Sequence, residues 1–407
     1  MIEISSAQDL KRLRRLALSS QGLLKPDTFG RGKSGAIKAI SHLGYVQIDT
    51  ISVVERAHHH VLQTRVSNVK AEMLNQLLVN RDIFEYWSHA AAFLPMEDYR
   101  FSLPYKEAIK SGQTHWFKNP DRKLMANLLE RIRVEGPLRS RDVEVSAKKQ
   151  AGWWDWKPAK KALEQLYMQG DLMVSCRDGF QKTYDITERV LPAHVNRNLP
   201  SVDEFAAHLL DQQLRCHGVV SLKGLTYLRR NTGIKKAMKQ LLQERLDQIR
   251  LEPIRLPDGE VYFIEKGGFE SRLARSNKRL QILSPFDNCV IQRERLKGIF
   301  AFQYQIECYV PEAKRQYGYF CLPLLYQDEF IGRMDCKTHR KDRHFEIKNL
   351  HLETRFIEKK AFDQADFIAA FVLAVSQFKA FQGCDTASVT AMLPIKILPA
   401  LQKALME

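Results

Sequence analysis

Apolar positions in the middle of the chain follow a helical period three times and then a strand period. The predicted elements are helices over 122–135, 138–143 and 156–170 and strands over 172–175 and 183–186. Gly136-Pro137 ends the first helix, and Asp178-Gly179 is a strong hairpin turn between the two strands. Three helices followed by a hairpin are typical of a winged helix, whose helix-turn-helix presents a helix to a DNA groove.

The same order recurs further along the chain. Helices are predicted over 202–216, 222–228 and 233–246, and strands over 254–256 and 261–264. Two units in the same order, roughly 80 residues apart, favour tandem winged helices more than either unit does alone. The N-terminal third, with helical patterns over 6–18, 35–43 and 69–78, could hold a third and more elaborate copy.

The pattern changes character after about residue 280. Strict alternation of apolar and polar residues predicts a strand over 300–307. Three further strands, bounded by short polar turns, are predicted over 317–325, 330–336 and 344–352, and a closing helix over 362–381. Together these patterns predict an α+β protein with a small antiparallel sheet or barrel at its C-terminal end. The predicted division is 1–118, 119–200 and 201–270 for three winged-helix units and 271–407 for the β-rich part.

Composition narrows the function. With 44% hydrophobic and 27% charged residues, the 407-residue chain is globular rather than disordered or fibrous. Its 63 Lys and Arg against 47 Asp and Glu leave a net charge of +16. A surplus of this size favours a polyanionic partner, nucleic acid first and an anionic membrane second. A basic soluble enzyme with no such partner is the alternative.

Targeting and redox signals point to the cytoplasm. No basic segment followed by an apolar core marks a secretory signal near Met1, and the apolar stretch from Phe367 to Phe378 is shorter than a bilayer requires. The seven cysteines are scattered and include no C-x-x-C pair. We therefore expect reduced thiols, a cytoplasmic location and no membrane partner.

Gln47 and Asp49 place two polar side chains inside the apolar run 44–51. In a strand, residues two apart project from the same face, so the pair could hold a water molecule and accept its proton. The alternative is that Asp49 caps a helix beginning at Thr50, or that both residues are ordinary surface residues.

Two histidine-containing segments follow. In a strand, His58 and His60 would share a face as two metal ligands do, but no third ligand accompanies them. Polar packing or contact with phosphate is therefore favoured over a metal, and no metal or other cofactor is expected. Trp87 and His89, in the segment 85–90, combine an aromatic ring with an imidazole as nucleic-acid clefts do, although core packing would give the same pattern.

Basic residues cluster around the third helix of both clear winged-helix units. The cluster consists of Lys157 and Lys160 in the first unit and Arg229, Arg230, Lys235, Lys236 and Lys239 in the second. A basic helix neutralises phosphates and gives affinity without sequence preference, whereas a solvated surface is the alternative. The repetition at equivalent helices favours DNA.

Several motifs are missing from the sequence. It contains no G-x-x-x-x-G-K-[ST], no G-x-G-x-x-G after a strand and no G-x-S-x-G. Gly30-Arg31-Gly32-Lys33-Ser34 lacks the preceding apolar strand and the glycine spacing of a phosphate loop. A nucleotide cofactor is therefore not expected.

An ordered set of segments resembles the AlkZ/YcaQ-type winged-helix DNA glycosylases of bacteria, in particular the YcaQ-like branch, over nearly the whole chain. The segments are 46–51, 56–60, 85–90, 283–288 and 309–319. The resemblance implies three tandem winged helices in a C shape and a C-terminal β-rich part. It also implies that Gln47 and Asp49 form the catalytic Gln-x-Asp motif. Arg56, His58, His60, Trp87 and His89, which lie in the matching segments, are expected to bind DNA.

The resemblance further implies the substrate. The family excises bulky or crosslinking N7-alkylated purines, and its YcaQ-like members are associated with interstrand crosslinks. The expected partner is therefore double-stranded DNA that carries such lesions, and the expected enzyme is a monomer. Because no lysine in the motif could form a Schiff base, we expect a monofunctional glycosylase without lyase activity. The alternative class is a DNA-binding regulator without enzymatic activity, which several winged helices would also allow.

Overall fold

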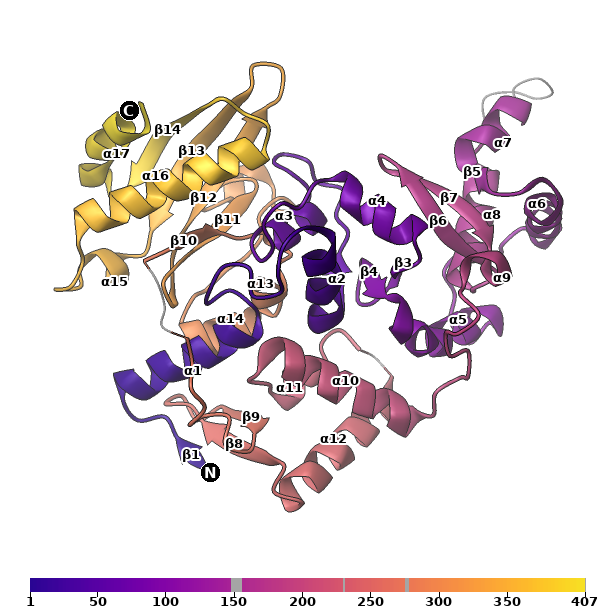
Figure 1. Cartoon of the computed structure of the whole chain (residues 1–407), viewed down its shortest axis with the longest axis horizontal. Helices are drawn as coiled ribbons and strands as arrows, with labels where there is room; N and C mark the ends of the chain where they lie inside the picture. Colours follow the sequence, from indigo (N-terminus) through magenta and orange to yellow (C-terminus); the bar gives the residue numbers. More distant parts are fainter. Residues whose placement is uncertain (148–155, 230, 275–277, 407) are drawn as a thin grey trace. The chain divides into compact units, whose positions relative to one another are not determined.

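The computed structural model describes residues 1–147, 156–229, 231–274 and 278–406. They form two compact units (Figure 1): Met1–Val69 together with Ala206–Glu407, and Lys70–Phe205. The second unit is therefore inserted into the chain of the first. The division into four segments at 118, 200 and 270 stays a prediction.

The inserted unit, residues 70–205, is mainly helical with two small groups of strands. Its helices are α4 (Glu72–Val79), η1 (Met96–Ser102), α5 (Leu103–Lys110), α6 (Arg122–Glu135), α7 (Ser140–Ala147), α8 (Trp156–Met168) and α9 (Thr187–Val190). Its strands are β3 (Ile83–Trp87), β4 (Ala91–Pro95), β5 (Leu138–Arg139), β6 (Leu172–Asp178) and β7 (Gln181–Ile186). β3 and β4 form an antiparallel hairpin, and β5, β7 and β6 form an antiparallel sheet in that order.

The hairpin of β6 and β7 lies at the predicted turn, where Asp178 pairs with Gln181. Strand β5 replaces the start of the predicted short helix, because Leu138 pairs with Tyr184 of β7. Such a pairing is a tertiary contact that local helical spacing does not reveal. Behind this sheet, Leu128 of α6 and Leu163 of α8 are buried in one apolar core with Tyr184.

The larger unit contains the N-terminal helices and the second half of the chain. Its helices are α1 (Ala7–Ser20), α2 (Gly32–Leu43), α3 (Ala57–Gln63), most of α10 (Val202–His217), α11 (Leu222–Leu225), α12 (Thr232–Asp247), α13 (Asn288–Ile291), α14 (Arg293–Phe300), η2 (Glu312–Lys314), α15 (Thr354–Ile357), α16 (Gln364–Phe381), η3 (Ile395–Ile397) and α17 (Leu398–Met406). Its strands are β1 (Ile2–Glu3), β2 (Val46–Gln47), β8 (Leu251–Arg255), β9 (Val261–Glu265), β10 (Leu280–Ile282), β11 (Cys321–Tyr326), β12 (Glu329–His339), β13 (His344–Leu352) and β14 (Thr386–Leu393).

Helices α10, α11 and α12 precede the antiparallel hairpin of β8 and β9, in the predicted order. The N-terminal strand β1 adds to this hairpin in parallel, with Ile2 beside Ile254. The first and third quarters of the chain therefore share one small sheet.

The C-terminal sheet is open and mixed rather than an antiparallel barrel. Its strand order is β10-β11-β12-β13-β14, and β14 runs parallel to β13. In the described part of the chain the two outer strands, β10 and β14, do not pair with each other, so the predicted closure into a barrel is wrong. Strands β11, β12 and β13 correspond to the last three predicted strands, whereas β10 and β14 lie outside the predicted set.

The strand predicted over 300–307 is absent. Helix α14 extends to Phe300, and residues 301–307 belong to no sheet. The alternation is nevertheless real, because Phe302 and Tyr304 are buried and their rings stack at 6.1 Å between centroids. An alternating pattern shows which side of an extended segment is buried but does not show whether another strand pairs with it.

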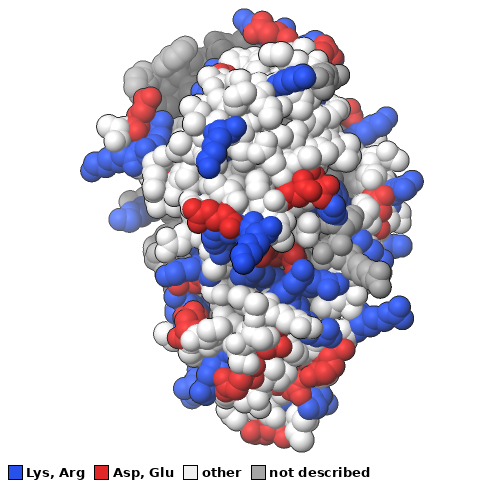
Figure 2. Space-filling view, turned by 90° about the vertical axis from the view of Figure 1, so that its left-hand side faces the viewer, with Lys and Arg blue, Asp and Glu red and all other residues white. Residues whose placement is uncertain are grey.

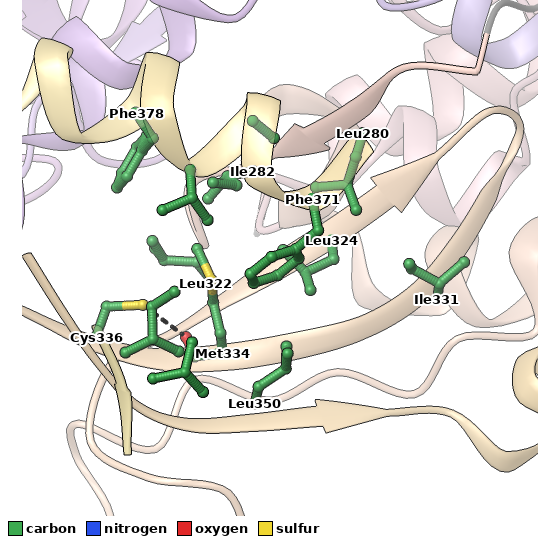
Figure 3. Close-up of a cluster of buried hydrophobic side chains, with 14 of the residues drawn as sticks. Leu280, Ile282, Leu322, Leu324, Ile331, Met334, Cys336, Leu350, Phe371 and Phe378 are labelled. Carbon is green, nitrogen blue, oxygen red and sulfur yellow. Dashed lines mark hydrogen bonds between the residues drawn. The ribbon is translucent and has the colours of Figure 1, made fainter. Parts of the chain in front are cut away.

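Helix α16 covers one face of the C-terminal sheet. Figure 3 shows Phe371 and Phe378 of this helix among side chains from the strands, with Phe371 directed at Leu324. Among the described residues, α16 alone is long and apolar enough to cross a membrane by length and composition. Its phenylalanines belong to the core of the larger unit, as in the core helix of a globular protein.

Candidate active site

The segment from Tyr45 to Arg56, between α2 and α3, carries the predicted catalytic pair. Gly44 ends α2 with φ +79°, a left-handed conformation that favours glycine, and a Cβ there would lie 2.2 Å from the Gln212 amide. Strand β2 then covers only Val46 and Gln47, so Asp49 follows it in irregular chain. The prediction that both polar residues share one strand face is therefore wrong.

Asp49 is buried, with 8% of its surface exposed, and so is Gln47. No helix begins at Thr50; instead, an Asp49 carboxylate oxygen accepts the backbone N–H of Ile51 at 2.9 Å. Burial raises the pKa of this carboxyl group above its ordinary value, and the nearby N–H groups and the charge of Arg56 offset only part of that rise. The site therefore holds a partly desolvated carboxylate.

Residues from the C-terminal sheet and α16 hold this segment in place. The backbone N–H of Thr338 donates to the Val53 carbonyl at 2.9 Å. Arg340 donates to the carbonyls of Ser52 at 2.8 Å and Val54 at 3.2 Å. These bonds join residues of β12 and its turn to the chain just after Asp49. Sequence patterns gave no signal for them, because they use backbone carbonyls.

Gln382, after α16, adds a further support. Its side-chain oxygen accepts the backbone N–H of Glu55 at 2.6 Å and the Thr338 hydroxyl at 3.0 Å. Glu55 directly precedes Arg56, whose charge acts on Asp49. The backbone is therefore fixed from Ser52 to Glu55, which limits how far the Asp49 carboxylate can move.

The charge of Asp49 acts on two side chains of the loop between α14 and β11. Burial raises the pKa of the Cys308 thiol, and the negative charge of Asp49 raises it further. Asp49 also contributes to a raised pKa of Tyr309, after burial and the adjacent Cys308. The sequence places this loop in the family-like segment 309–319 but gives it no role.

A buried polar cluster lies under the start of the segment. The Asn288 amide donates to the Tyr45 carbonyl at 3.1 Å, next to β2. Its neighbour Asp287 forms a two-pronged ion pair with Arg65 at 2.7 and 2.9 Å, and both side chains are fully buried. The segment 283–288, one of those that carry the family resemblance, therefore has a structural role.

The three consecutive histidines lie in helix α3 rather than in a strand, which makes the prediction of a shared strand face wrong. His58 and His60 are buried. A ring nitrogen of His60 lies 2.8 Å from the Ile282 carbonyl, and burial lowers the His60 pKa to about 4. Its ring also packs on Phe378 at 4.9 Å, so His60 belongs to the core. In the part of the chain that the structure describes, no group of three or more His, Cys, Asp and Glu could hold a metal.

The segment 85–90 belongs to the inserted unit. Glu85 is buried and pairs with Arg177 at 2.7 and 2.8 Å and with Lys182 at 2.9 Å. Trp87 is half-buried and packs edge-on against Trp116 at 4.9 Å. His89 is half-buried in the turn between β3 and β4. Glu85 therefore orders this hairpin, and Trp87 and His89 lie at its end.

The basic residues at α12 are mostly exposed. Lys235, Lys236 and Lys239 lie in its first half with their side chains in solvent. Arg229 is half-buried before the helix, and burial lowers its pKa to about 10. Arg230 lies outside the described residues.

In the inserted unit, Lys160 is exposed on α8, and Lys157 lies in the first turn of that helix. The face in Figure 2 carries interspersed acidic and basic residues and a broad area with neither. The charge of +16 is therefore not concentrated on that face.

Comparisons with known proteins agree with the resemblance. The family model described as "DNA glycosylase AlkZ-like" matches residues 40–371, a range that contains Gln47, Asp49 and the loop near Tyr309. Among solved structures, the Streptomyces sahachiroi DNA glycosylase AlkZ is similar with a TM-score of 0.59 and 14% sequence identity. The match covers 94% of this chain and 98% of that chain. At that identity the likeness shows a shared fold.

Proposed function

Because the chain belongs to the AlkZ-like DNA glycosylase family, we propose that it hydrolyses the N-glycosidic bond of N7-alkylated purines in duplex DNA, including bulky and crosslinking adducts. One observation carries the proposal: the buried carboxylate of Asp49, two residues after Gln47, has a raised pKa and a fixed backbone on its C-terminal side. A carboxylate of this kind suits both tasks that the reaction sets.

The first task is to stabilise positive charge on the sugar. Alkylation at N7 makes the purine cationic, so the electron pair of the C1′–N9 bond can leave with the base, which departs neutral. The sugar then carries the positive charge of an oxocarbenium-like transition state. The Asp49 anion, held where water is largely excluded, stabilises that charge more strongly than an exposed carboxylate would.

The second task is to activate water. As the water oxygen bonds to C1′, one of its protons passes to Asp49, which acts as general base. The raised pKa makes the Asp49 carboxylate a stronger base than an ordinary aspartate, so it accepts that proton more readily. Gln47, which is neutral and carries both a donor and an acceptor, is suited to orienting the water or the sugar-phosphate backbone. No step requires a cofactor or a lysine Schiff base.

DNA binding is assigned to the helical units. We propose that the segments from α6 to β7 and from α10 to β9 are winged helices, because each consists of three helices followed by a β-hairpin. Lys235, Lys236 and Lys239 are the proposed phosphate contacts of the larger unit, together with Arg229. His60 is left out of the proposed contacts because its side chain lies in the core.

The test compares Asp49→Asn with wild type on a duplex that contains 7-methylguanine, at saturating enzyme in a single turnover. The rate should fall by about 10²–10⁴-fold, the usual worth of a positioned general base. Affinity for the duplex should change little, because Asn keeps the shape and can still accept the Ile51 N–H. Asp258→Asn, at the exposed turn between β8 and β9, is the matched control and should leave the rate unchanged.

The pH dependence tests the same residue. Only ionised Asp49 can act as anion and base, and its pKa is raised, so the wild-type rate should begin to fall at a higher pH than an ordinary aspartate would give. The small remaining rate of Asp49→Asn should lack this acidic limb. An equal rate of base release by Asp49→Asn and wild type would show that the site is assigned wrongly.

A further inference from the structure

Helix α10 is the first helix of the proposed winged helix in the larger unit, and its C-terminal half packs against the chain that leads into the catalytic segment. Gln212 is buried in this half of the helix. Its side-chain amide lies so close to Gly44 that a Cβ atom at Gly44 would overlap it. Gly44 ends α2 and directly precedes the segment that carries Gln47 and Asp49, so α10 contacts the start of that segment.

Arg215, one helical turn further along α10, binds the same end of α2. The last carbonyl groups of an α-helix have no partner within the helix. The Arg215 guanidinium donates to two of them, the Ser41 carbonyl at 3.2 Å and the His42 carbonyl at 3.3 Å. A positive charge is also favoured at a helix C-terminus, where the helix dipole is negative. Because residues three apart lie on the same side of a helix, Gln212 and Arg215 hold the end of α2 from one face of α10.

The end of α10 also belongs to the buried polar cluster beneath the catalytic segment. The Gln21 side-chain amide donates to the Cys216 carbonyl at 2.8 Å. Arg65 donates to the backbone carbonyl of Gln21 at 2.7 Å and to its side-chain oxygen at 3.1 Å. Arg65 forms the buried ion pair with Asp287, whose neighbour in the chain binds the Tyr45 carbonyl. The end of α10 and the start of the catalytic segment therefore share one buried network.

The other side of α10 is bonded to the helix that carries the proposed phosphate contacts. Lys235, Lys236 and Lys239 lie in α12. Arg245 of α12 donates to Asp211 of α10 at 2.9 Å. Helix α10 thus lies between α12 and the end of α2 (Figure 1) and is bonded to both.

We infer that α10 aligns the catalytic segment with bound DNA, and that Gln212 and Arg215 are the positioning residues through which it does so. The inference rests on the proposed function and deepens it. Phosphate contacts fix the register and orientation of a protein on the duplex, so the α12 lysines also set where the rest of the larger unit meets the DNA. A displacement of about 1 Å at the reacting groups can cost on the order of 100-fold in rate. The bonds from α10 to α2 keep Asp49 from shifting relative to those lysines.

The test begins with Arg215→Met, which removes both bonds at an exposed position. With 7-methylguanine in a duplex and saturating enzyme, this change should lower the single-turnover rate by about 10-fold, and adding Gln212→Ala should lower it by about 100-fold in all. Arg215→Lys keeps the charge and can donate to one of the carbonyls, so it should recover part of the rate. Arg250→Met, at an exposed arginine between α12 and β8, is the matched control and should leave this rate unchanged.

Two measurements separate positioning from a general weakening of the protein. Arg215→Met and Arg250→Met should bind an undamaged duplex with equal dissociation constants, because each removes one positive charge and both keep the α12 lysines. In the Asp49→Asn background, Arg215→Met should change the remaining rate by less than about twofold, because no carboxylate is left to position.

Two results would overturn the inference and leave the proposed function standing. One is a rate for Arg215→Met equal to that of Arg250→Met. The other is an equal fall in rate with and without the Asp49 carboxylate, which would show a structural effect that does not act through Asp49. Absence of base release by the wild type from any alkylated duplex would instead overturn the proposed function itself.

Discussion

Lys106 is a buried amine whose removal should stabilise the inserted unit. It lies in α5 with 2% of its surface exposed. Its nitrogen faces the rings of Tyr99 at 3.9 Å, Tyr86 at 4.6 Å and Phe84 at 5.7 Å. Burial lowers the Lys106 pKa from 10.5 to about 7. Folding therefore works against the protonated form of this side chain.

The size of the effect follows from the shift. A fall in pKa from 10.5 to about 7, at about 1.36 kcal/mol for each pKa unit, corresponds to about 5 kcal/mol of unfolding free energy. The aromatic rings stabilise the cation by roughly 0.5–2 kcal/mol, so the expected net loss of unfolding free energy is about 3–4.5 kcal/mol. The unfolding free energy of the wild type is highest above pH 10.5, where the amine is neutral in both the folded and the unfolded state. It falls as the pH is lowered from 10.5 toward 7, because the unfolded state then binds a proton that the folded state does not. Lys106→Met should therefore be more stable than wild type by about 3–4.5 kcal/mol at about pH 6, with the difference vanishing above about pH 10.

Tryptophan fluorescence reports on this unit alone. The chain has five tryptophans, and all of them lie within residues 70–205. Urea unfolding followed by this signal at pH 6, 8 and 10 gives the free energy for each variant. Lys110→Met, in the same helix, is the matched control. The exposed Lys110 has a raised pKa from its bond to Asp171, so its removal should cost a little stability at pH 6.

Two outcomes would refute the reasoning about Lys106. Equal stabilisation by Lys106→Met at pH 6 and pH 10 would show that packing, and not the charge, sets the difference. A lower stability of Lys106→Met at pH 6 would show that the aromatic rings stabilise the cation by more than burial penalises it.

Three further predictions concern DNA, the buried ion pair and metals. Replacing Lys235, Lys236 and Lys239 with Ala should weaken binding similarly on unrelated duplexes, and the slope of log affinity against log salt concentration should fall by about one for each phosphate that is no longer neutralised. A variant that loses affinity for one sequence only would contradict this. Asp287→Asn should destabilise the larger unit by about 3–5 kcal/mol, because it leaves the Arg65 charge buried and unpaired. Circular dichroism during urea unfolding measures this loss, and an unchanged unfolding midpoint would contradict the prediction. A chelator should leave base release unchanged, and activity restored by a divalent metal after chelation would overturn the metal-free mechanism.

The sequence predicted what depends on local pattern. The Asp178-Gly179 hairpin and the helices α6, α8, α10 and α12 lie close to the predicted ranges, because turn chemistry and helical spacing are encoded within a few residues. The parallel strand β14 was missed because its pairing with β13 depends on a crossover through α16, which no short window contains.

In the candidate site, too, the local features were predicted and the contacts between distant residues were not. Gln47 and Asp49 were identifiable as polar residues in an apolar run, but their shared strand face was wrong because β2 ends at Gln47. The bond from Arg340 to Ser52 joins residues 288 positions apart and uses a carbonyl that every residue carries. A contact of that kind leaves no mark on composition or periodicity, so only the folded chain reveals what holds Asp49.

The insertion of residues 70–205 into the larger unit has a consequence for synthesis on the ribosome. The inserted unit is complete once residue 205 has emerged, whereas the larger unit waits for partners that are made much later. The chain around Asp49 is translated early, yet Thr338, Arg340 and Gln382, which fix it, come near the end of translation. A polypeptide interrupted before residue 338 would therefore carry the helices proposed to bind DNA and would keep the bond from Asn288 to the Tyr45 carbonyl, but it would lack the bonds that fix the chain just after Asp49. Under the proposed function such a fragment would bind a lesion without removing it, so translation of the last quarter of the chain is a condition for the proposed activity.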